Sequence, residues 1–266
     1  MISLGVVVPL YNKLIIDTPI YQSVSKFGSD YVKIYICDNS TDMSIKVINK
    51  SFCSDDKYAI YLDMHSNAGY SKACNYAINI MREDAICIFD DDTRPCPDFF
   101  QRVLFHLENT PKEAKVFIPI VETSGVLLSP LRVFGPAIFR IKSPAKLNLE
   151  KCSAINSGLV FRREVFSQVR FDENLFLDFV DHALFRELHS KRIKLTLMPD
   201  VILDQNYSAN SNSLNAALFR AKIQYKDIRE FYSVSPLYSF YGAAYIGYLK
   251  IKRCIMYRSF AFLMIY

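Results

Sequence analysis

Short apolar runs alternate with helix-like segments along the first 120 residues of this chain. An apolar run bounded by polar residues is typical of a strand that is buried on both faces of a parallel sheet. Strands and helices that alternate at this spacing indicate parallel βαβ units with right-handed crossovers. We therefore predict an α/β fold with a mostly parallel central sheet flanked by helices. The predicted strands are 4–9, 32–37, 58–62, 85–89 and 115–120, and the predicted helices are 18–27, 43–50, 70–82 and 98–108.

The remainder of the chain divides into three stretches. Ser, Pro and Gly interrupt residues 121–149, which predicts short strands and loops. A helix is predicted at 179–190 and a strand at 193–198, and the chain then becomes helical and basic. We expect an α/β domain over residues 1–205 and a basic, aromatic-rich helical extension over residues 206–266.

Polar clusters follow the first four predicted strands. In an open α/β sheet, ligands bind beyond the carboxyl ends of the strands. Because parallel strands end at the same edge of the sheet, we expect the four clusters to surround one nucleotide pocket. The clusters are residues 9–12, 38–42, 67–75 and 90–92.

Single residues in these clusters suit particular parts of a nucleotide. Tyr11 can stack on a base, and Asp38 can accept hydrogen bonds from a base or a ribose. Lys72, in the first turn of a predicted helix, adds positive charge to backbone N–H groups that face a diphosphate. The chain has no GxGxxG after its first strand and no GxxxxGK[ST], which disfavours a dinucleotide dehydrogenase and a P-loop kinase.

The aspartate triplet Asp90-Asp91-Asp92 directly follows the apolar run 85–89. Side chains two apart in an extended chain face the same way, so Asp90 and Asp92 converge while Asp91 faces elsewhere. Two converging carboxylates suit a hard divalent cation, which often also binds substrate phosphates. The alternative is a solvated acidic turn.

Four motifs, VVVPLYN, ICDNSTD, NAGYSKACN and IFDDDTRP, resemble in their order and spacing those of family 2 glycosyltransferases with the GT-A fold. The resemblance covers residues 4–205. It implies that the aspartate motif binds Mn²⁺ or Mg²⁺ on the diphosphate of a nucleotide sugar and that Asp38 contacts the base. Asn156-Ser157-Gly158 resembles the family's small-residue turn near the donor and acceptor sugars, although a plain tight turn would look the same. The donor-binding residues that we predict are Pro9, Tyr11, Asn12, Asp38, Asn67, Gly69, Lys72, Asp90, Asp91, Asn156 and Gly158, and the predicted metal ligands are Asp90, Asp92 and Asp204.

Residues 171–181 resemble the segment that holds the family's Glu-Asp pair, in which the aspartate is the catalytic base. Here the pair is Val180-Asp181, so the glutamate is missing and the resemblance assigns the base to Asp181. Asp178 and Asp181 are spaced as in an F-x-D-x-x-D pattern that resembles the rhamnosyltransferase-like branch. Asp178 is therefore a second catalytic candidate. If both aspartates lay in the first helical turn, their proximity would raise one pKa and help that group to accept a proton. The alternative for Asp178 is ordinary helix capping. The family's histidine after the last strand is also missing, and Asp204 is the candidate in its place.

The net charge of +5 is concentrated at the end of the chain. Residues 217–266 carry eight basic side chains and two acids, and no acid occurs from residue 231 onward, where Tyr and Phe are dense. No apolar stretch is long enough for a spanning helix. Such an end is typical of a membrane-surface segment, and the alternative is a helix that packs on the body or on another subunit. No nucleic-acid recognition motif accompanies the charge, so we expect no nucleic-acid partner.

The seven cysteines are scattered and none forms a CxxC pair, which favours free thiols in a reducing compartment. The chain opens directly into a strand, so we expect no secretion signal and a cytoplasmic protein. The basic tail adds the expectation that the protein is peripheral at the inner face of the plasma membrane.

We predict an inverting, metal-dependent hexosyltransferase of surface polysaccharide synthesis. It would move a sugar from a nucleotide-diphosphate donor, with dTDP-rhamnose or a UDP-sugar as candidates, to a glycan or lipid-linked glycan acceptor. The alternatives are a non-catalytic nucleotide-sugar-binding or scaffold protein and a nucleotidyltransferase. The latter usually carries a Gly-rich basic loop after the first strand, and residues 9–12 lack one.

Overall fold

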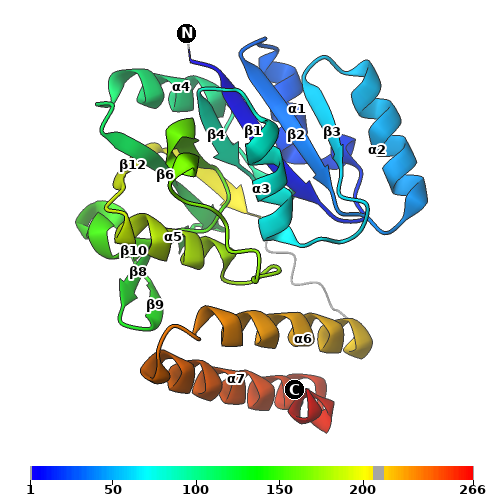
Figure 1. Cartoon of the computed structure of the whole chain (residues 1–266), viewed down its shortest axis with the longest axis vertical. Helices are drawn as coiled ribbons and strands as arrows, with labels where there is room; N and C mark the ends of the chain where they lie inside the picture. Colours follow the sequence, from blue (N-terminus) through cyan, green and yellow to red (C-terminus); the bar gives the residue numbers. More distant parts are fainter. Residues whose placement is uncertain (1, 206–212, 266) are drawn as a thin grey trace.

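The computed structural model describes residues 2–205 and 213–265, and Figure 1 shows them as a sheet domain next to a helical hairpin. Nine strands form the central sheet. They are β1 (Leu4–Leu10), β2 (Val32–Asp38), β3 (Ala59–Asp63), β4 (Ala85–Ile88), β5 (Thr93–Arg94), β6 (Ala114–Thr123), β7 (Val126–Ser129), β11 (Leu159–Arg162) and β12 (Lys194–Gln205).

The strand order is β3-β2-β1-β4-β11-β6-β12-β5, with β7 paired to β6. β1 pairs in parallel with β2 and β4, β2 with β3, and β6 with β12. The shorter strands β5, β7 and β11 pair antiparallel. The predicted α/β fold with a mostly parallel sheet is confirmed.

The sheet buries apolar side chains on both faces because successive residues of a strand point to opposite sides. In β1, Val6 and Val8 belong to one apolar cluster and Val7 belongs to the other. The first cluster includes side chains of α1 (Pro19–Phe27), α2 (Met43–Asp55) and α4 (Phe99–Asn109), and the second includes side chains of α3 (Tyr70–Ile80) and α5 (Val180–Ser190). This two-sided burial explains why the strands are apolar runs rather than alternating patterns.

Two long helices, α6 (Leu214–Phe231) and α7 (Pro236–Tyr257), form the hairpin drawn in orange and red in Figure 1. The residues Ala217, Ala221 and Tyr225 of α6 are buried in the cluster that also contains side chains of α3 and α5, so α6 packs against the sheet domain. Residues 206–212 of the predicted extension lie outside the described residues. Among the helices that are described, none is long and apolar enough to cross a membrane.

Several predicted boundaries differ from the structure. The strand predicted at 115–120 is longer because β6 pairs with both β12 and β7. The helix predicted at 43–50 continues to Asp55 because Cys53 packs into the core. Residues 121–149 contain short strands, as predicted, and a second sheet combines β10 (Cys152–Ser153), β8 (Leu131–Phe134) and β9 (Ala137–Arg140). All seven cysteines have free thiols.

The α6–α7 hairpin depends on a close approach at Gly242. A β-carbon at this position would lie 2.8 Å from the Cβ of Tyr232, whereas one at Gly247 of the same helix would meet nothing within 4 Å. Gly242→Ala should therefore lower the free energy of unfolding by about 1–3 kcal/mol through overpacking. Gly247→Ala should raise it by up to about 1 kcal/mol through helix propensity. Urea unfolding measures both, and equal stability of the two variants would contradict this packing.

Candidate active site

A cavity of about 750 Å³ opens at the carboxyl ends of β1 and β4. The segments that follow β1, β2, β3 and β4 line one part of it, and α5 and α6 line another part. This edge of the sheet is where α/β folds bind ligands. The lining residues are Pro9, Leu10, Tyr11, Asn39, Asn67, Gly69, Tyr70, Asp90, Asp91, Asp92, Ile155, Asn156, Phe176, Leu177, Val180, Asp181, Gln205, Ala216, Phe219, Arg220 and Ile223.

Asp90 is held by two hydroxyl groups from other segments. Its Oδ1 accepts a hydrogen bond from Tyr70 at 2.9 Å and its Oδ2 accepts one from Ser157 at 2.5 Å. Burial is the main cause that raises the pKa of Asp90 to about 6, and the charges of Asp92 and Asp181 add to the rise. The two hydrogen bonds act in the opposite direction because they favour the ionised form. Negative charge is therefore concentrated here.

Asp92 and Asn156, which both line the cavity, each have an unsatisfied oxygen. The Oδ1 atoms of both side chains are buried and have no hydrogen-bond partner among residues 2–205 and 213–265. Buried polar atoms in proteins are nearly always paired, and an unpaired one costs free energy. These two oxygens therefore lack the pairing that a bound ligand could supply.

Asp181 belongs to the first turn of α5 and lines the same cavity as the aspartate triplet. Its Oδ1 accepts a hydrogen bond from the backbone N–H of His182 at 2.7 Å. The predicted convergence of Asp90, Asp92 and Asp181 on one cavity is thus present in the structure.

The family model for glycosyl transferase family 2 matches residues 5–170, which is more than half of the chain. This chain belongs to glycosyl transferase family 2. An uncharacterized glycosyltransferase of Methanocaldococcus jannaschii is 22% identical over 148 residues, which are 55% of this chain. The chain spans half the length of that relative.

Solved structures share the fold of this family 2 chain. A mannosyltransferase of Pyrobaculum calidifontis, in complex with GDP-Man and Mn²⁺, has a TM-score of 0.56 at 13% identity, over 92% of this chain and 74% of that one. Glucosyl-3-phosphoglycerate synthase of Mycobacterium tuberculosis, in complex with Mn²⁺, UDP and glucosyl-3-phosphoglycerate, has a TM-score of 0.58 at 13% identity, over 88% and 81%. The predicted GT-A fold is confirmed.

Most of the predicted donor-binding residues line the cavity of this family 2 chain. Asp91 lies there too, although alternation along an extended chain predicted that it faces elsewhere. Its carboxylate lies 3.6 Å from Nζ of Lys13, which also donates to the Asp91 carbonyl oxygen. Burial raises the pKa of Asp91, and the charge of Lys13 opposes the rise. The predicted residues that line the cavity are Pro9, Tyr11, Asn67, Gly69, Asp90, Asp91 and Asn156.

Four predicted donor-binding residues are not among the lining residues. The side chain of Asn12 accepts hydrogen bonds from the backbone N–H groups of Thr41 and Asp42, which joins two of the loops. Asp38 is fully buried and accepts from the backbone N–H of Ser40, the amide of Asn49 and the hydroxyl of Tyr61. These two residues stabilise the loops at this edge of the sheet through their hydrogen bonds. The other two are Lys72, which is exposed on α3, and Gly158.

Gly158 has a positive φ of 74°, and a β-carbon there would lie 2.3 Å from the Leu203 side chain. Its role in the structure is close packing of the backbone, which agrees with the predicted close approach. Asp204, the third predicted metal ligand, is exposed on β12. Its neighbour Gln205 lines the cavity, and because side chains alternate along a strand, Asp204 points to the other face.

The described residues contain no group of three or more His, Cys, Asp or Glu side chains placed to hold a metal. Asp90 and Asp92 remain as two carboxylates that line one cavity. Carboxylate oxygens are the ligands that Mn²⁺ and Mg²⁺ prefer, and Mg²⁺ is commonly held by one or two carboxylates plus substrate phosphates. The two aspartates therefore fit a cation that is shared with a diphosphate.

Both sequence-based placements of Asp178 are wrong. It precedes α5 and is separated from it by Phe179, whose φ is 62°, so it neither shares the first turn with Asp181 nor caps the helix. Its carboxylate forms a two-pronged ion pair with Arg220, in which Nη2 lies 2.8 Å from Oδ1, and it accepts a hydrogen bond from Gln224. Asp178 is not among the cavity-lining residues because α6 holds its carboxylate.

Other site residues were missed by sequence reasoning. Tyr70 lies inside the NAGYSKACN motif but had no assigned role, and burial next to Asp90 raises its pKa well above the usual value, so its hydroxyl stays a donor. The residues of α6 belong to no recognised motif, and the extension was predicted to dock on a membrane surface or to pack on the body or on another subunit, without a part in the site. They are Ala216, Phe219, Arg220 and Ile223.

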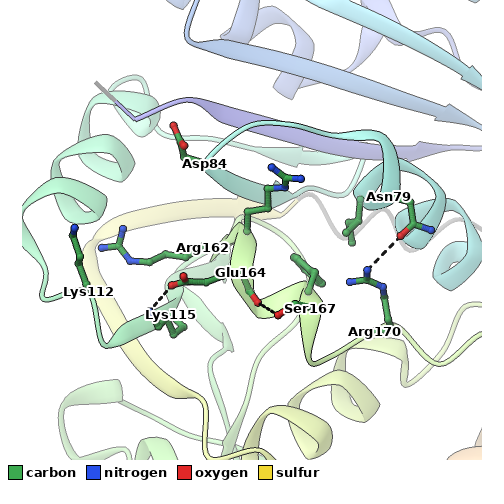
Figure 2. A pocket seen from close by; sticks show the side chains of 11 residues that line it. Asn79, Asp84, Lys112, Lys115, Arg162, Glu164, Ser167 and Arg170 are labelled. Carbon is green, nitrogen blue, oxygen red and sulfur yellow. Dashed lines mark hydrogen bonds and ion pairs between the residues drawn. The ribbon is translucent and has the colours of Figure 1, made fainter.

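A second hollow, of about 660 Å³, lies at the opposite end of β4 and is lined by several basic residues (Figure 2). Most of its cationic groups are already bound to the protein. Arg162 donates to three backbone carbonyl oxygens, Lys115 pairs with Glu164, and Arg170 contacts Asn79. Since ligands bind at the carboxyl ends of the strands, this hollow is not the reaction site.

Because Asp90 is buried beside other carboxylates, we predict that its ionisation lowers the free energy of unfolding as pH rises. The native state binds the Asp90 proton more tightly than the unfolded chain, where the pKa is near 3.8, so stability falls as pH rises from about 4 to about 6. Asp90→Asn should remove this loss and raise the free energy of unfolding at pH 7.5 by up to about 3 kcal/mol, with little effect at pH 4. The exposed Asp55→Asn is the control, with a change below about 0.5 kcal/mol. Denaturant unfolding across this pH range measures both, and an Asp90→Asn variant no more stable than wild type at pH 7.5 would contradict the assigned electrostatics.

Proposed function

We propose that this chain is an inverting glycosyltransferase that uses a divalent cation and a nucleotide-sugar donor. The observation that carries the proposal is that Asp90, Asp92 and Asp181 line one cavity at the carboxyl edge of a GT-A sheet. The cavity combines carboxylates, which suit a cation and a proton acceptor, with asparagine side chains, which suit sugar hydroxyl groups.

Asp90 and Asp92 would hold the cation. The unpaired Oδ1 of Asp92, and the burial next to other carboxylates that raises the pKa of Asp90, support this assignment. A bound Mn²⁺ or Mg²⁺ supplies Lewis-acid stabilisation of the charge on a departing nucleoside diphosphate, worth several kcal/mol. Tyr70 and Ser157 orient the Asp90 carboxylate through their hydroxyl groups.

Asp181 accepts the proton of the acceptor hydroxyl as that oxygen attacks the anomeric carbon. One direct displacement inverts the configuration of the sugar. Tyr11 and the asparagines Asn39, Asn67 and Asn156 contribute further polar side chains to the cavity wall and position the donor. The neighbours in complex with GDP-Man and UDP support a nucleoside diphosphate sugar as the donor.

The donor candidates remain UDP-sugars and dTDP-rhamnose, and the acceptor candidates are glycans or lipid-linked glycans of surface polysaccharide synthesis. One observation favours the non-catalytic alternative. Val180 stands where the family has a glutamate, and it is buried in the apolar core at 3% exposure. A hydrolysis screen with a panel of nucleotide sugars and Mn²⁺ separates the two functions, because only an enzyme turns over a donor.

Asp181→Asn should leave donor binding nearly intact and lower transfer by about 100- to 10,000-fold, because general-base help is lost. The matched control is Glu187→Gln, which removes a carboxylate from the same helix outside the cavity and should keep transfer within about two-fold. Steady-state kinetics with the donor selected by the screen measures both. Near-normal turnover of Asp181→Asn would refute the assigned base.

The outer face of α7 extends the proposal to a membrane surface. Leu237, Phe240, Tyr248, Ile251 and Ile255 recur at helical spacing, and all are exposed, with Phe240 at 76% and Ile255 at 74%. The 3-10 helix Phe260–Met264 adds further exposed apolar side chains. An exposed stripe of this size marks an interaction site.

Charge on the same segment favours an anionic lipid surface as the partner. Lys252 and Arg258 are exposed, and no acid occurs between residues 231 and 266. Basic groups near an anionic surface contribute about 1 kcal/mol each, and buried apolar side chains add to this. Docking here would bring the enzyme to lipid-linked acceptors.

The double variant Phe240→Ser/Ile255→Ser should lose binding to vesicles that contain phosphatidylserine by at least about 10-fold, since about 1.5 kcal/mol or more of apolar burial is lost per side chain. Phe105→Ser removes an aromatic side chain of similar exposure, 61%, from α4 and should bind normally. Co-sedimentation measures both. Equal binding by the double variant and Phe105→Ser would exclude this face. Truncation at residue 231 is a poorer test because Ile246 and Phe262 belong to the core.

A further inference from the structure

Asp227 of α6 is a fully buried carboxylate that reaches across to the loop before α5. Its Oδ1 accepts a hydrogen bond from the backbone N–H of Phe176 at 3.0 Å. Its Oδ2 accepts hydrogen bonds from Leu177 and Asp178, both at 2.8 Å. Charge-assisted bonds of this kind are stronger than neutral ones. One side chain of the C-terminal hairpin thus binds three successive backbone groups of the sheet domain.

The loop that Asp227 binds is itself part of the cavity. Phe176 and Leu177 line it. The carbonyl oxygen of Phe176 accepts a hydrogen bond from the backbone N–H of Tyr70 at 2.6 Å. The ring of Phe176 packs so closely on Gly69 that a β-carbon there would lie 2.7 Å from it. Through Tyr70, whose hydroxyl donates to Asp90, the loop is therefore connected to the proposed metal-binding carboxylates.

On its other side the loop leads directly into the base helix. Phe179 adopts a left-handed φ of 62° immediately before α5, which begins at Val180 and carries Asp181 as its second residue. Bulky residues adopt this conformation only where surrounding contacts hold them in place. The ion pair between Asp178 and Arg220 is a second contact with α6, so the hairpin holds this entry to α5 from two positions.

We infer that Asp227 is a positioning residue for catalysis, which fixes residues 176–178 and through them the Asp181 carboxylate and the Tyr70 hydroxyl in the cavity. This inference rests on the proposed function. It makes the C-terminal hairpin a working part of the active site rather than an appendage. Small misplacements of a catalytic group are costly, since a shift of about 1 Å can lower turnover by about 100-fold.

The test compares Asp227→Asn with Glu230→Gln in the full chain. The amide of Asn offers one acceptor oxygen in place of two, so at least one of the three loop bonds is lost. Glu230→Gln removes a carboxylate from the same helix and leaves all three bonds in place. Circular dichroism and thermal unfolding establish that both variants are folded at the assay temperature.

The first readout is hydrogen exchange of the loop amides, which needs no substrate. Exchange at residues 176–178 should be at least about 10-fold faster in Asp227→Asn than in wild type and unchanged in Glu230→Gln. Unchanged exchange in Asp227→Asn would overturn the anchoring role. This readout stands even if the wild type turns over none of the nucleotide sugars, a result that would count against the proposed function instead.

The second readout separates positioning from general stability. With the donor that wild type turns over fastest, kcat of Asp227→Asn should fall by about 100-fold while KM for the donor stays within about three-fold. Faster exchange with unchanged kcat would overturn the positioning role. If Asp227→Asn fails to fold, Asp227→Glu takes its place, because it keeps the charge and displaces the loop by one methylene. Its kcat should fall by about 10-fold at unchanged KM, and a wild-type kcat would overturn the inference.

Discussion

The burial of carboxylates at the end of β4 is the constraint on which the rest of the site depends. Asp90 lies beside Asp92 and near Asp181, and burial with these neighbours raises the pKa of Asp90 to about 6. Two hydroxyl groups offset part of this cost, and the Oδ1 of Asp92 has no partner within the described chain. A protein that concentrates negative charge in this way gives up stability for binding, which is the expected trade-off at a functional site.

Segments far apart in the sequence together build this carboxylate site. The segment after β4 supplies the aspartates, the turn after Asn156 supplies Ser157, and the start of α3 supplies Tyr70. The helical hairpin covers another side of the cavity, since α6 lines it and also binds the loop before α5 (Figure 1). The same hairpin presents the exposed face of α7 on its outer side. In the proposed function, these two helices contact the membrane, bring the enzyme to its acceptor and hold Asp181 in position.

Much of the fold and part of the site follow from the sequence. Apolar runs located the parallel strands, and their shared carboxyl edge placed Asp90 and Asp92 at the predicted nucleotide pocket. Only the family resemblance placed Asp181 at the same site. Other features have no local signature. Asp178 matched a motif, yet its partner Arg220 lies 42 residues away, and Asp227 lies 51 residues from Phe176. Lys72 lies in the first turn of α3, as predicted, but it is exposed and does not line the cavity, whereas Tyr70 of the same turn donates to Asp90.

The central claim is that Asp90 and Asp92 prepare the cavity for a cation shared with a nucleoside diphosphate. Calorimetric titration of UDP, GDP and dTDP, with and without Mn²⁺, tests it most directly in wild type and in Asp92→Asn. We expect one of the three to bind at least about 10-fold more tightly with Mn²⁺ in wild type, and we expect Asp92→Asn to lose that gain. An equal gain in both proteins, or no Mn²⁺ effect in wild type, would contradict the claim.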